Sequence, residues 1–322
     1  MEKLVDLVVP MYKCKETLLK LLASVASQSV KDTIHIILVQ DYDGEDYTEL
    51  ISMFNPMLDI ELIAMDKNSG PGTTRRVGMQ KGTSPYIMFM DADDTFQNPF
   101  AVQELYETIT KDDFDAVNSI FLEQTTKDMG SFIPHNNNDW VWVFGKIYKR
   151  QFLEDNKIYL NDSRANEDTG FNTVVSTVGK VGFLNDSTYI WWFKEDSITR
   201  VNEGIYRFTG IEGWLYNMGW VVDNLVRLKV DKEIIIKRCT GTLVATYCWY
   251  LEFLHDKDER IDTNKFLEWV KVFVKDYYNE FIPTKEILNE VYQQHAASKG
   301  LIEHIPELTL MDYIKLVGGK EC

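Results

Sequence analysis

The chain has 322 residues, 45% of them hydrophobic, and a formal net charge of −16. A chain of this length favours one large domain followed by a smaller one. The acidic balance argues against a general nucleic-acid-binding protein, because contacts to phosphate need Lys and Arg. A basic segment between Arg227 and Arg238 is a candidate positive patch, but Asp231 and Glu233 interrupt it, which favours a solvated helix face.

The cysteines and the hydropathy pattern bear on the compartment. The four cysteines, Cys14, Cys239, Cys248 and Cys322, form no Cys-x-x-Cys pair and no metal-ligand spacing, which indicates reduced thiols. The longest apolar stretch without a charge, residues 239–251, is shorter than the roughly 20 residues that span a bilayer. The sequence enters a strand-like run at once, without a signal-peptide pattern. We therefore expect a cytoplasmic protein that is soluble or attached peripherally to a membrane.

Strand and helix signals alternate along the first third of the chain. Apolar runs predict strands at Val5–Val9, Ile34–Val39, Ile60–Met65, Tyr86–Met90 and Phe114–Phe121. Helices are predicted between them by the spacing of Leu18, Leu21, Leu22 and Val25, by Gly70-Pro71-Gly72, and by Asn98 with Pro99 in a first helical turn. This alternation predicts a parallel, doubly wound α/β sheet, in which ligands bind beyond the carboxyl ends of the strands.

The rest of the chain changes character. Residues 127–139 are polar and predict a surface loop. The spacing of Phe171, Val174, Val175 and Val178 predicts an amphipathic helix that begins at Glu167, and short strands are predicted at Val181–Leu184 and Thr188–Phe193. From about residue 201 the pattern is helical to the end. We expect an α/β domain over residues 1–200 and a smaller α-helical C-terminal domain over residues 201–322.

Three carboxylates follow the predicted strand Tyr86–Met90, in the sequence Asp91-Ala92-Asp93-Asp94. Holding them together is costly unless a cation offsets their charge. Carboxylate oxygens suit Mg²⁺ or Mn²⁺ rather than Zn²⁺. A divalent ion there would bridge a nucleotide diphosphate and stabilise the charge that develops when a sugar–phosphate bond breaks. A surface turn is the alternative, and the Asp-x-Asp pattern taken alone favours it.

A second acidic pair, Glu167-Asp168, starts the predicted amphipathic helix. Acids occur at the amino end of a helix simply because the helix dipole stabilises them there, and the pair taken alone favours that explanation. The alternative is that Asp168 takes a proton from an acceptor hydroxyl.

A series of motifs in a fixed order extends over residues 5–199. They are Val8-Val9-Pro10-Met11-Tyr12, Leu38-Val39-Gln40-Asp41, Asn68-Ser69-Gly70-Pro71-Gly72 with Arg75, Tyr86 to Asp94, Gly145-Lys146-Ile147-Tyr148, Asn166-Glu167-Asp168-Thr169-Gly170-Phe171, and Tyr189 to Thr199 with Lys194, Ser197 and Thr199. In this order they resemble the GT-A-fold family of inverting glycosyltransferases called family 2. No single motif is specific, but their order over this length is.

The resemblance implies roles for individual residues. A nucleotide-sugar donor would be held by Pro10, Tyr12, Asp41, Asn68, Arg75, Asp91, Ala92 and Lys146. Asp93 and Asp91 would hold Mn²⁺ or Mg²⁺, and Lys146 or Lys194 would help to neutralise the diphosphate. Asp168 would be the general base, with Glu167 supporting a sugar. Gln40 and Gly170 replace acids that are common in the family, which puts the choice of donor in doubt.

The leading hypothesis is therefore a hexosyltransferase-type enzyme whose residues 1–200 bind a nucleotide sugar, most simply a UDP-sugar. It would transfer one sugar to an acceptor hydroxyl with inversion, since the Gln-x-x-Arg-Trp motif of processive members is absent. One alternative is a nucleotidyltransferase, although residues 10–16 contain none of the glycines of its phosphate loop. Another is a non-catalytic sugar-nucleotide-binding protein of the same fold, against which the presence of Asp91, Asp93 and Asp168 argues.

Residues 202–322 lie outside the resemblance. Their aromatic residues Trp214, Tyr216, Trp220, Tyr247, Trp249 and Tyr250 are expected to pack between helices, with an acceptor groove as the less favoured alternative. We expect this region to serve the acceptor side or self-association into a homo-oligomer. A saccharide, a lipid-linked saccharide, a protein and a modified nucleic acid are all compatible acceptors.

Overall fold

The computed structural model describes residues 2–126, 130–195, 205–299 and 308–321. The chain divides into two compact units, Met1–Lys194 and Glu195–Cys322. The predicted boundary at residue 200 and the motif residues Ser197 and Thr199 lie outside the described residues, so they stay predictions.

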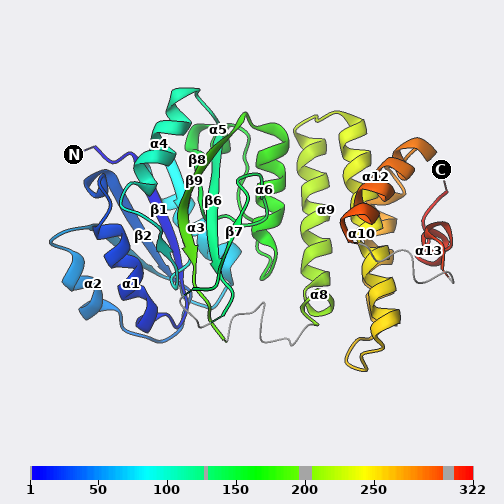
Figure 1. Ribbon diagram of the computed structural model, residues 1–322, viewed down its shortest axis with the longest axis horizontal. Coiled ribbons are helices and arrows are strands. Elements are labelled where there is room, and N and C mark those ends of the chain that lie inside the picture. The colour runs from blue at the N-terminus through cyan, green and yellow to red at the C-terminus, as the bar shows by residue number, and fades with distance from the viewer. Residues whose placement is uncertain (1, 127–129, 196–204, 300–307, 322) are drawn as a thin grey trace. The chain divides into compact units, whose positions relative to one another are not determined.

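The first unit is built on one sheet, whose strands lie side by side in Figure 1. The strands are β1 (Val5–Met11), β2 (Ile34–Gln40), β3 (Asp59–Ala64), β4 (Tyr86–Phe89), β5 (Thr95–Phe96), β6 (Ala116–Gln124), β7 (Phe132–His135), β8 (Lys146–Lys149) and β9 (Val181–Trp191). Their order is β3-β2-β1-β4-β8-β6-β9-β5, and β7 pairs with β6. β1 to β4 are parallel, and β8 runs antiparallel between β4 and β6. The sheet is mostly parallel, as the alternating pattern predicts.

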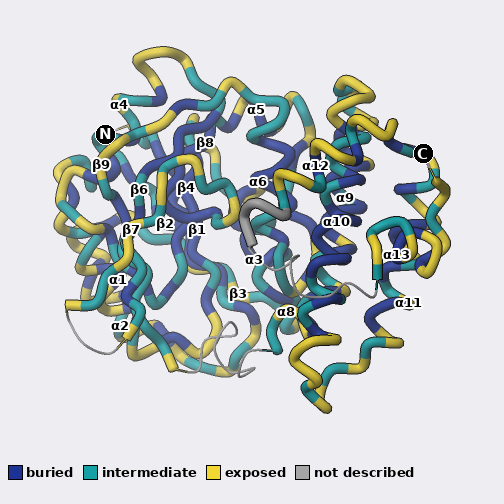
Figure 2. The backbone as a smooth tube through the Cα atoms, turned by 45° about the vertical axis from the view of Figure 1, so that its right-hand side comes forward, coloured by how far each residue is buried: buried dark blue, intermediate teal, exposed yellow. Residues whose placement is uncertain are grey.

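Helices cover both faces of this sheet. They are α1 (Lys15–Ala26), η1 (Lys31–Thr33), α2 (Thr48–Phe54), α3 (Pro71–Lys81), α4 (Ala101–Lys111), α5 (Arg150–Asp155) and α6 (Glu167–Val178). On one face, alternate residues of β1 such as Leu7 and Val9 belong to the core cluster that includes the apolar faces of α1, α2 and α4. On the other face, α3 approaches Val8 at Gly78, and α6 packs Phe171 against Phe89 of β4. The fold is therefore doubly wound, and its central strands β1 and β4 are largely buried (Figure 2).

Three predicted elements differ from the structure. β9 is one strand rather than two, because β6 pairs with it on both sides of the polar Asn185-Asp186 step, which falls at a register shift between Asn118 and Ile120. The predicted loop 127–139 contains β7, which adds to the edge of β6. α4 begins at Ala101, since Asn98 instead accepts a hydrogen bond from the backbone of Phe100 in a turn before the helix.

The second unit is helical wherever it is described, as predicted. It contains α8 (Tyr206–Thr209), α9 (Ile211–Arg227), α10 (Lys232–Asp256), α11 (Thr263–Phe273), the π-helix η2 (Val274–Tyr278), α12 (Lys285–Lys299) and α13 (Leu310–Leu316). Trp214 packs edge-on against Trp249 with ring centroids 4.7 Å apart, and Tyr247 lies 5.4 Å from Tyr313. These rings pack between helices, which confirms the favoured interpretation for them, whereas Tyr216 is 51% exposed.

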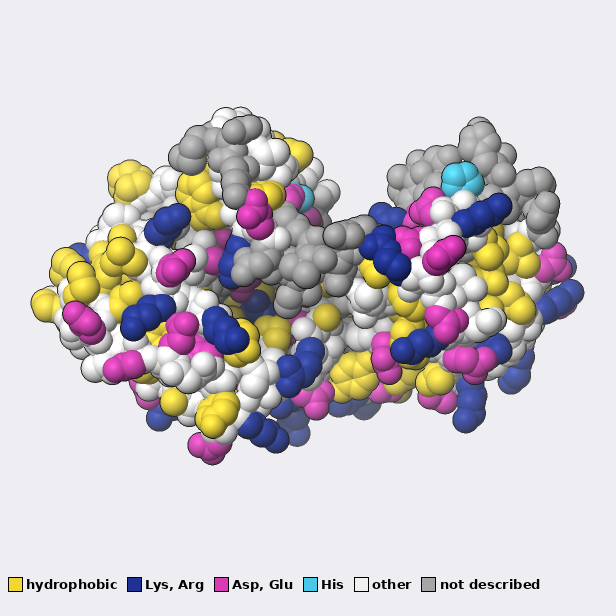
Figure 3. Space-filling view, turned by 90° about the horizontal axis from the view of Figure 1, so that it is seen from below, with side chains coloured by type: hydrophobic (Ala, Val, Ile, Leu, Met, Phe, Trp, Pro, Cys, Tyr) yellow, Lys and Arg dark blue, Asp and Glu magenta, His cyan; other side chains and the backbone are white. Residues whose placement is uncertain are grey.

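The basic segment of the second unit carries its own acidic partners. Lys237, at the centre of the basic segment, forms ion pairs with Glu233 and Glu290, so this segment is not a free positive patch. Figure 3 shows acidic and basic side chains interspersed on the face that it presents. Cys14, Cys239 and Cys248 are free thiols. Across the described ranges, no helix combines the length and the apolar character needed to cross a bilayer.

Candidate functional site

The carboxyl ends of β1, β2 and β4 meet at one edge of the sheet, where ligands bind in folds of this kind. Met11 at the end of β1 is in register with Gln40 at the end of β2, and β4 pairs with the other side of β1. Tyr12, Asp41 and Asp91 follow these strand ends directly or within two residues. The topology therefore brings together three segments in which the sequence predicts donor-binding residues.

Asp41 organises the loop that precedes α3. Its two carboxylate oxygens accept hydrogen bonds from the backbone N–H groups of Ser69 (2.6 Å) and Gly70 (2.9 Å). Asn68 donates to the backbone oxygen of Asp41 and accepts from Arg164, at 3.2 and 2.8 Å. The predicted residues Asp41 and Asn68 are thus in contact with each other, and part of the hydrogen-bonding capacity of Asp41 is used inside the protein.

Tyr12 presents an open aromatic surface at the same edge. Its side chain is 50% exposed, and the ammonium of Lys13 lies 5.3 Å from the ring centroid. Pro10, two residues earlier on β1, pairs with Val39 near the end of β2. An exposed ring on a rigid strand end is a surface on which a nucleobase can stack.

Each carboxylate of the Asp91–Asp94 segment has a different partner. Asp94 is buried, accepting hydrogen bonds from the hydroxyl of Tyr189 (2.6 Å) and the backbone N–H of Trp192 (2.9 Å). Asp93 lies 3.5 Å from the ammonium of Lys194, and Asp91 lies 2.6 Å from the guanidinium of Arg75. The expectation that these carboxylates need an offsetting cation is met in part by the protein's own Arg75 and Lys194.

The side chains of Asp91 and Asp93 are exposed enough for their carboxylate oxygens to bind a metal ion. Their side chains are 31% and 34% exposed, whereas Ala92 between them is buried. Burial, followed by the charge of Asp91, raises the pKa of Asp93. Among the described residues, no group of three or more His, Cys, Asp or Glu side chains could hold a metal. Mg²⁺ is commonly held by one or two carboxylates together with waters and substrate phosphates, so this pair fits a metal that arrives with a nucleotide.

Arg75 connects the end of β4 to the start of α6. It lies on α3, its side chain is only 7% exposed, and two of its nitrogens donate to Asp91 and to Glu167. Its third nitrogen, Nε, is buried and has no acceptor among the described residues. The structure therefore brings Arg75, Asp91 and Glu167 together, although they are far apart in sequence.

Glu167 and Asp168 begin α6 but point to different surroundings. Glu167 is buried and paired with Arg75. Burial raises the pKa of Glu167, and the positive charge of Arg75 lowers it by less. Asp168 accepts a hydrogen bond from the backbone N–H of Thr169 at 2.7 Å. Burial, with the negative charge of Glu167 added to it, raises the pKa of Asp168 to about 7. A carboxyl group that titrates near neutral pH is suited to exchange protons with a substrate.

Lys146 is placed on the side of Asp168 rather than with Asp91 and Asp93. It is completely buried at the start of β8, 3.5 Å from the backbone oxygen of Phe144 and 5.7 Å from the ring centroid of Trp140. Burial lowers its pKa to about 7, and the charges that oppose this are those of Asp139 and Asp168.

Asn172 adjoins the candidate site and was not among the residues that the sequence predicts. It lies one turn after Asp168 on α6, fully buried, and accepts a hydrogen bond from the hydroxyl of Tyr148 at 2.7 Å. Its amide donates to the backbone oxygen of Trp142 at 2.8 Å, so it ties α6 to the segment before β8. The available signal was an amide beside Phe171 on the buried side of a predicted helix.

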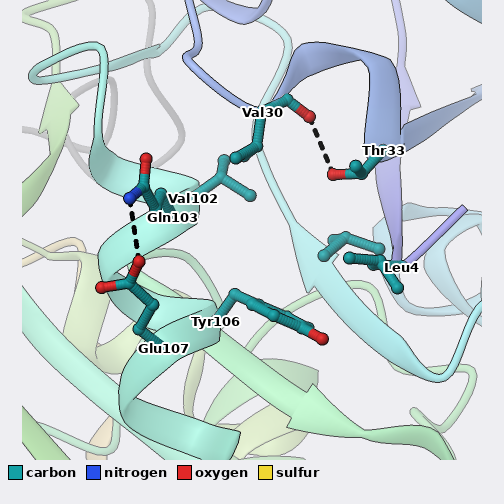
Figure 4. Close-up of a pocket in the computed structure, with 8 residues that line it drawn as sticks. Leu4, Val30, Thr33, Val102, Gln103, Tyr106 and Glu107 are labelled. Atoms are coloured by element: carbon teal, nitrogen blue, oxygen red, sulfur yellow. Dashed lines mark hydrogen bonds between the residues drawn. The ribbon is translucent and has the colours of Figure 1, made fainter.

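A cavity of about 280 Å³ lies elsewhere, at the amino end of β1 (Figure 4). Leu4, Val30, Val102 and Tyr106 line it, and Gln103 is hydrogen-bonded to Glu107 at its edge. None of the predicted site residues lines this cavity, and its lining is mainly apolar. We therefore assign the candidate site to the carboxyl edge of the sheet.

Comparison with known proteins identifies the family of the chain. Residues 6–165 match the family described as "Glycosyl transferase family 2". The chain belongs to glycosyl transferase family 2. The matched residues include the strand ends, α3 and the Asp91–Asp94 segment, and end just before Glu167.

Relatives and solved structures of this family are similar over different lengths. The "Processive diacylglycerol beta-glycosyltransferase" of Mycoplasma genitalium is 34% identical over 118 residues, which are 36% of this chain and 34% of that protein. The "Poly(ribitol-phosphate) beta-N-acetylglucosaminyltransferase TarS" of Staphylococcus aureus strain Mu50 is 22% identical over 204 residues, or 59% of this chain and 36% of that protein. The matches thus span about a third of these two relatives.

The fold is also that of a solved family member. The crystal structure of S. aureus TarS 1–349 in complex with UDP-GlcNAc superposes with a TM-score of 0.72 and 14% sequence identity, covering 96% of this chain and 95% of that one. At this identity the likeness establishes the GT-A fold, as the sequence predicts.

Proposed function

We propose that this family 2 protein is a glycosyltransferase that moves a sugar from a UDP-sugar to an acceptor hydroxyl. The observation that carries the proposal is the meeting of two acidic segments, Asp91–Asp94 after β4 and Glu167-Asp168 at the start of α6, on the single guanidinium of Arg75. One segment would serve the donor and the other the acceptor, as transfer between two bound substrates requires.

The donor would occupy the edge formed by the ends of β1 and β2. Pro10 and Tyr12 would support the base, and Asp41 with Asn68 would hold the adjoining part of the nucleotide through the loop that they organise. The similar structure of TarS is a complex with UDP-GlcNAc, which supports a uridine nucleotide sugar for this chain.

A divalent cation, Mn²⁺ or Mg²⁺, would be held by Asp91 and Asp93. When bound, it would supply positive charge to the diphosphate that leaves. Lys194, which lies beside Asp93, would add a further positive charge on the same side. The buried Lys146 lies instead among groups that surround Asp168, so its predicted contact with the diphosphate would require it to change position.

Asp168 would be the general base. Its raised pKa of about 7 means that its carboxylate takes up a proton readily near neutral pH, while the ionised form is still well populated above that pH. The kcat/KM for the donor, which reports the free protein, should therefore fall as the pH drops below about 7, because the protonated carboxyl group cannot accept the proton of the hydroxyl. In this arrangement Glu167 is buried against Arg75. Glu167 would therefore act through Arg75 rather than contact a sugar.

Inversion and single transfer are the finer parts of the proposal. A direct displacement with a base opposite the leaving diphosphate inverts the anomeric carbon, and the two relatives compared above are named beta-glycosyltransferases. Single transfer is proposed from the absence of the Gln-x-x-Arg-Trp motif, while the Mycoplasma genitalium relative is named processive. The number of sugars added to each acceptor distinguishes single from processive transfer.

The second unit would serve the acceptor side or self-association.

The test is a panel of nucleotide sugars incubated with the protein and a mixture of saccharide and lipid-linked acceptors. We expect release of UDP and a glycosylated product by mass spectrometry, lost in Asp168→Asn and lost on chelation. Release of pyrophosphate would instead indicate a nucleotidyltransferase. Binding of UDP-sugars without any turnover, in the presence of Mn²⁺ or Mg²⁺, would indicate a non-catalytic binding protein.

A further inference from the structure

We infer that Arg75 is a positioning residue that links Asp91 to the amino end of α6, so that a ligand taken up at Asp91 changes the charge state of Asp168. The role of this link in catalysis rests on the proposed function, whereas the contacts of Arg75 with Asp91 and Glu167 do not depend on it. The sequence predicts Arg75 as a direct contact of the nucleotide, whereas the structure buries it between two carboxylates of the protein.

The first support is the fixed position of α3. At Gly72 the site of an added Cβ atom is 2.4 Å from the backbone oxygen of Asn161 and 2.9 Å from Cγ of Glu167. At Gly78 it is 2.5 Å from a methyl group of Val8 on β1. The helix that carries Arg75 is therefore packed directly against both the central strand and the segment leading into α6. Arg75 cannot follow one carboxylate without changing its contact with the other.

The second support is the balance of charge. One guanidinium faces Asp91 and Glu167 directly, and Asp168 is the residue next to Glu167. The Nε group of Arg75 has no acceptor in the described part of the chain, so its three donor nitrogens are not saturated. A cation or a hydrogen-bond donor that binds Asp91 would compete with Arg75 for that carboxylate. More of the positive charge of Arg75 would then act on Glu167 and Asp168.

The third support is the set of groups around Asp168. Glu167 and Asp91 raise its pKa, while Arg75 lowers it. Lys146 on β8 and Tyr148 on the same strand also interact with its charge. Ligand uptake at Asp91 neutralises a charge that raises this pKa and releases one that lowers it, so both changes favour the ionised base. The base would thus become ready when the donor side is occupied.

The test measures the pKa of Asp168 directly, by NMR of protein labelled with ¹³C at the Asp carboxyl carbon, with Asp168→Asn used to assign the signal. The probes are UDP with Mg²⁺, which is diamagnetic. In the unsubstituted protein we expect UDP and Mg²⁺ to lower this pKa by about one unit, a tenfold change in the proton equilibrium. In Arg75→Gln we expect a higher pKa in the free protein and a smaller response to the probes.

The matched control is Arg150→Lys, which changes a second buried arginine, at the far end of the sheet. It should lower the melting temperature and leave the pKa of Asp168 and its response unchanged. Should Arg75→Gln fail to fold, Arg75→Lys keeps the charge but not the two-pronged contact, and an intermediate response is expected. A folded Arg75 variant with an unchanged Asp168 pKa and a full response to UDP and Mg²⁺ would overturn the inference.

The two proposals fail in different ways. If UDP does not bind to the unsubstituted protein, the proposed function is contradicted, while the free-protein comparison of Arg75→Gln still tests the link. If UDP binds and sugar is transferred but Arg75→Gln leaves the pKa of Asp168 where it was, the proposed function stands and the link is wrong.

Discussion

Two buried arginines lie at opposite ends of the same sheet, and their contacts differ in kind. At the amino end, Arg150 donates from all three guanidinium nitrogens, to Asp6 and to the backbone oxygens of Met79 and Ser84, at 2.6 to 2.8 Å. Asp6 is in turn saturated by the backbone and hydroxyl of Ser84. These contacts hold β1, α3, α5 and the segment before β4 together, and they leave no donor of Arg150 for a ligand.

At the carboxyl end, Arg75 serves two carboxylates, retains a buried Nε without an acceptor in the described chain, and lies near a third acid, Asp168, whose pKa is about 7. The same residue types thus give a saturated ion pair at one end and an unbalanced cluster at the other. Perturbed pKa values cluster at functional sites because substrate chemistry needs groups that are not already satisfied. The comparison separates the structural end of the sheet from the end that we propose to be reactive.

The largest expected effect on stability comes from the saturated end. Arg150→Met removes the cationic partner of the buried Asp6, and unpaired buried charges typically cost ~3–5 kcal/mol. Urea unfolding should show this loss. The affinity of the folded fraction for UDP should not change, since Arg150 lies at the other end of the sheet. An unchanged free energy of unfolding would contradict the structural role.

The two glycines at the ends of α3 sharpen the comparison. Gly82 directly follows α3, and an added Cβ atom there would lie 2.2 Å from a carboxylate oxygen of Asp6. Gly72 lies in the first turn of α3, where an added Cβ atom would lie 2.9 Å from Cγ of Glu167. Each Gly→Ala change should destabilise by ~1–3 kcal/mol through overpacking. Only Gly72→Ala should also lower turnover per folded molecule, because it displaces Glu167 from Arg75. Equal effects on turnover from both variants would contradict the division between the two ends.

A smaller effect is expected at Asp93. Asp93→Asn should weaken donor binding in the presence of Mg²⁺ or Mn²⁺ by at least ~10-fold, while binding measured in chelator should change little. Calorimetric titration with UDP at fixed metal concentration measures this difference. Asp113→Asn, a change of the same chemistry at a side chain that is 79% exposed, is the control. If metal does not improve UDP affinity in the unsubstituted protein, the metal role of Asp91 and Asp93 is wrong.

The sequence predicts the parallel half of the sheet because β1, β2 and β4 are continuous apolar runs buried on both faces. It does not predict β8, because Lys146-Ile147-Tyr148-Lys149 has a charge at each end, and only the structure shows that Lys146 is buried. β7 was hidden in a polar segment for a similar reason, since an edge strand needs little apolar sequence.

The sequence predicts where the site residues lie in the fold, but it does not predict which of them contact one another. Motif order places Asp41, Asn68, Asp91 and Asp168 at strand ends and at the start of a helix, and the topology confirms those positions. The pairing of Arg75 with Glu167 joins residues 92 positions apart, and no local pattern encodes it. The sequence groups Asp94 with Asp91 and Asp93. In the structure the side chain of Asp94 points inward and accepts a hydrogen bond from the hydroxyl of Tyr189 on β9, because a buried carboxylate needs a donor from a neighbouring strand.

The most direct test of this account measures stability and turnover on one preparation of Asp168→Asn. The folded-state pKa of Asp168, about 7, lies above the ordinary value near 3.9, so ionisation of this carboxyl destabilises the folded protein progressively from about pH 4 to pH 7 and fully above that. At pH 8 the account predicts a higher melting temperature than the unsubstituted protein, an advantage that disappears near pH 4, together with a ~10²–10⁴-fold loss of turnover. A lower melting temperature at pH 8 with near-normal turnover would contradict it, and would make Asp168 an ordinary acid at a helix start.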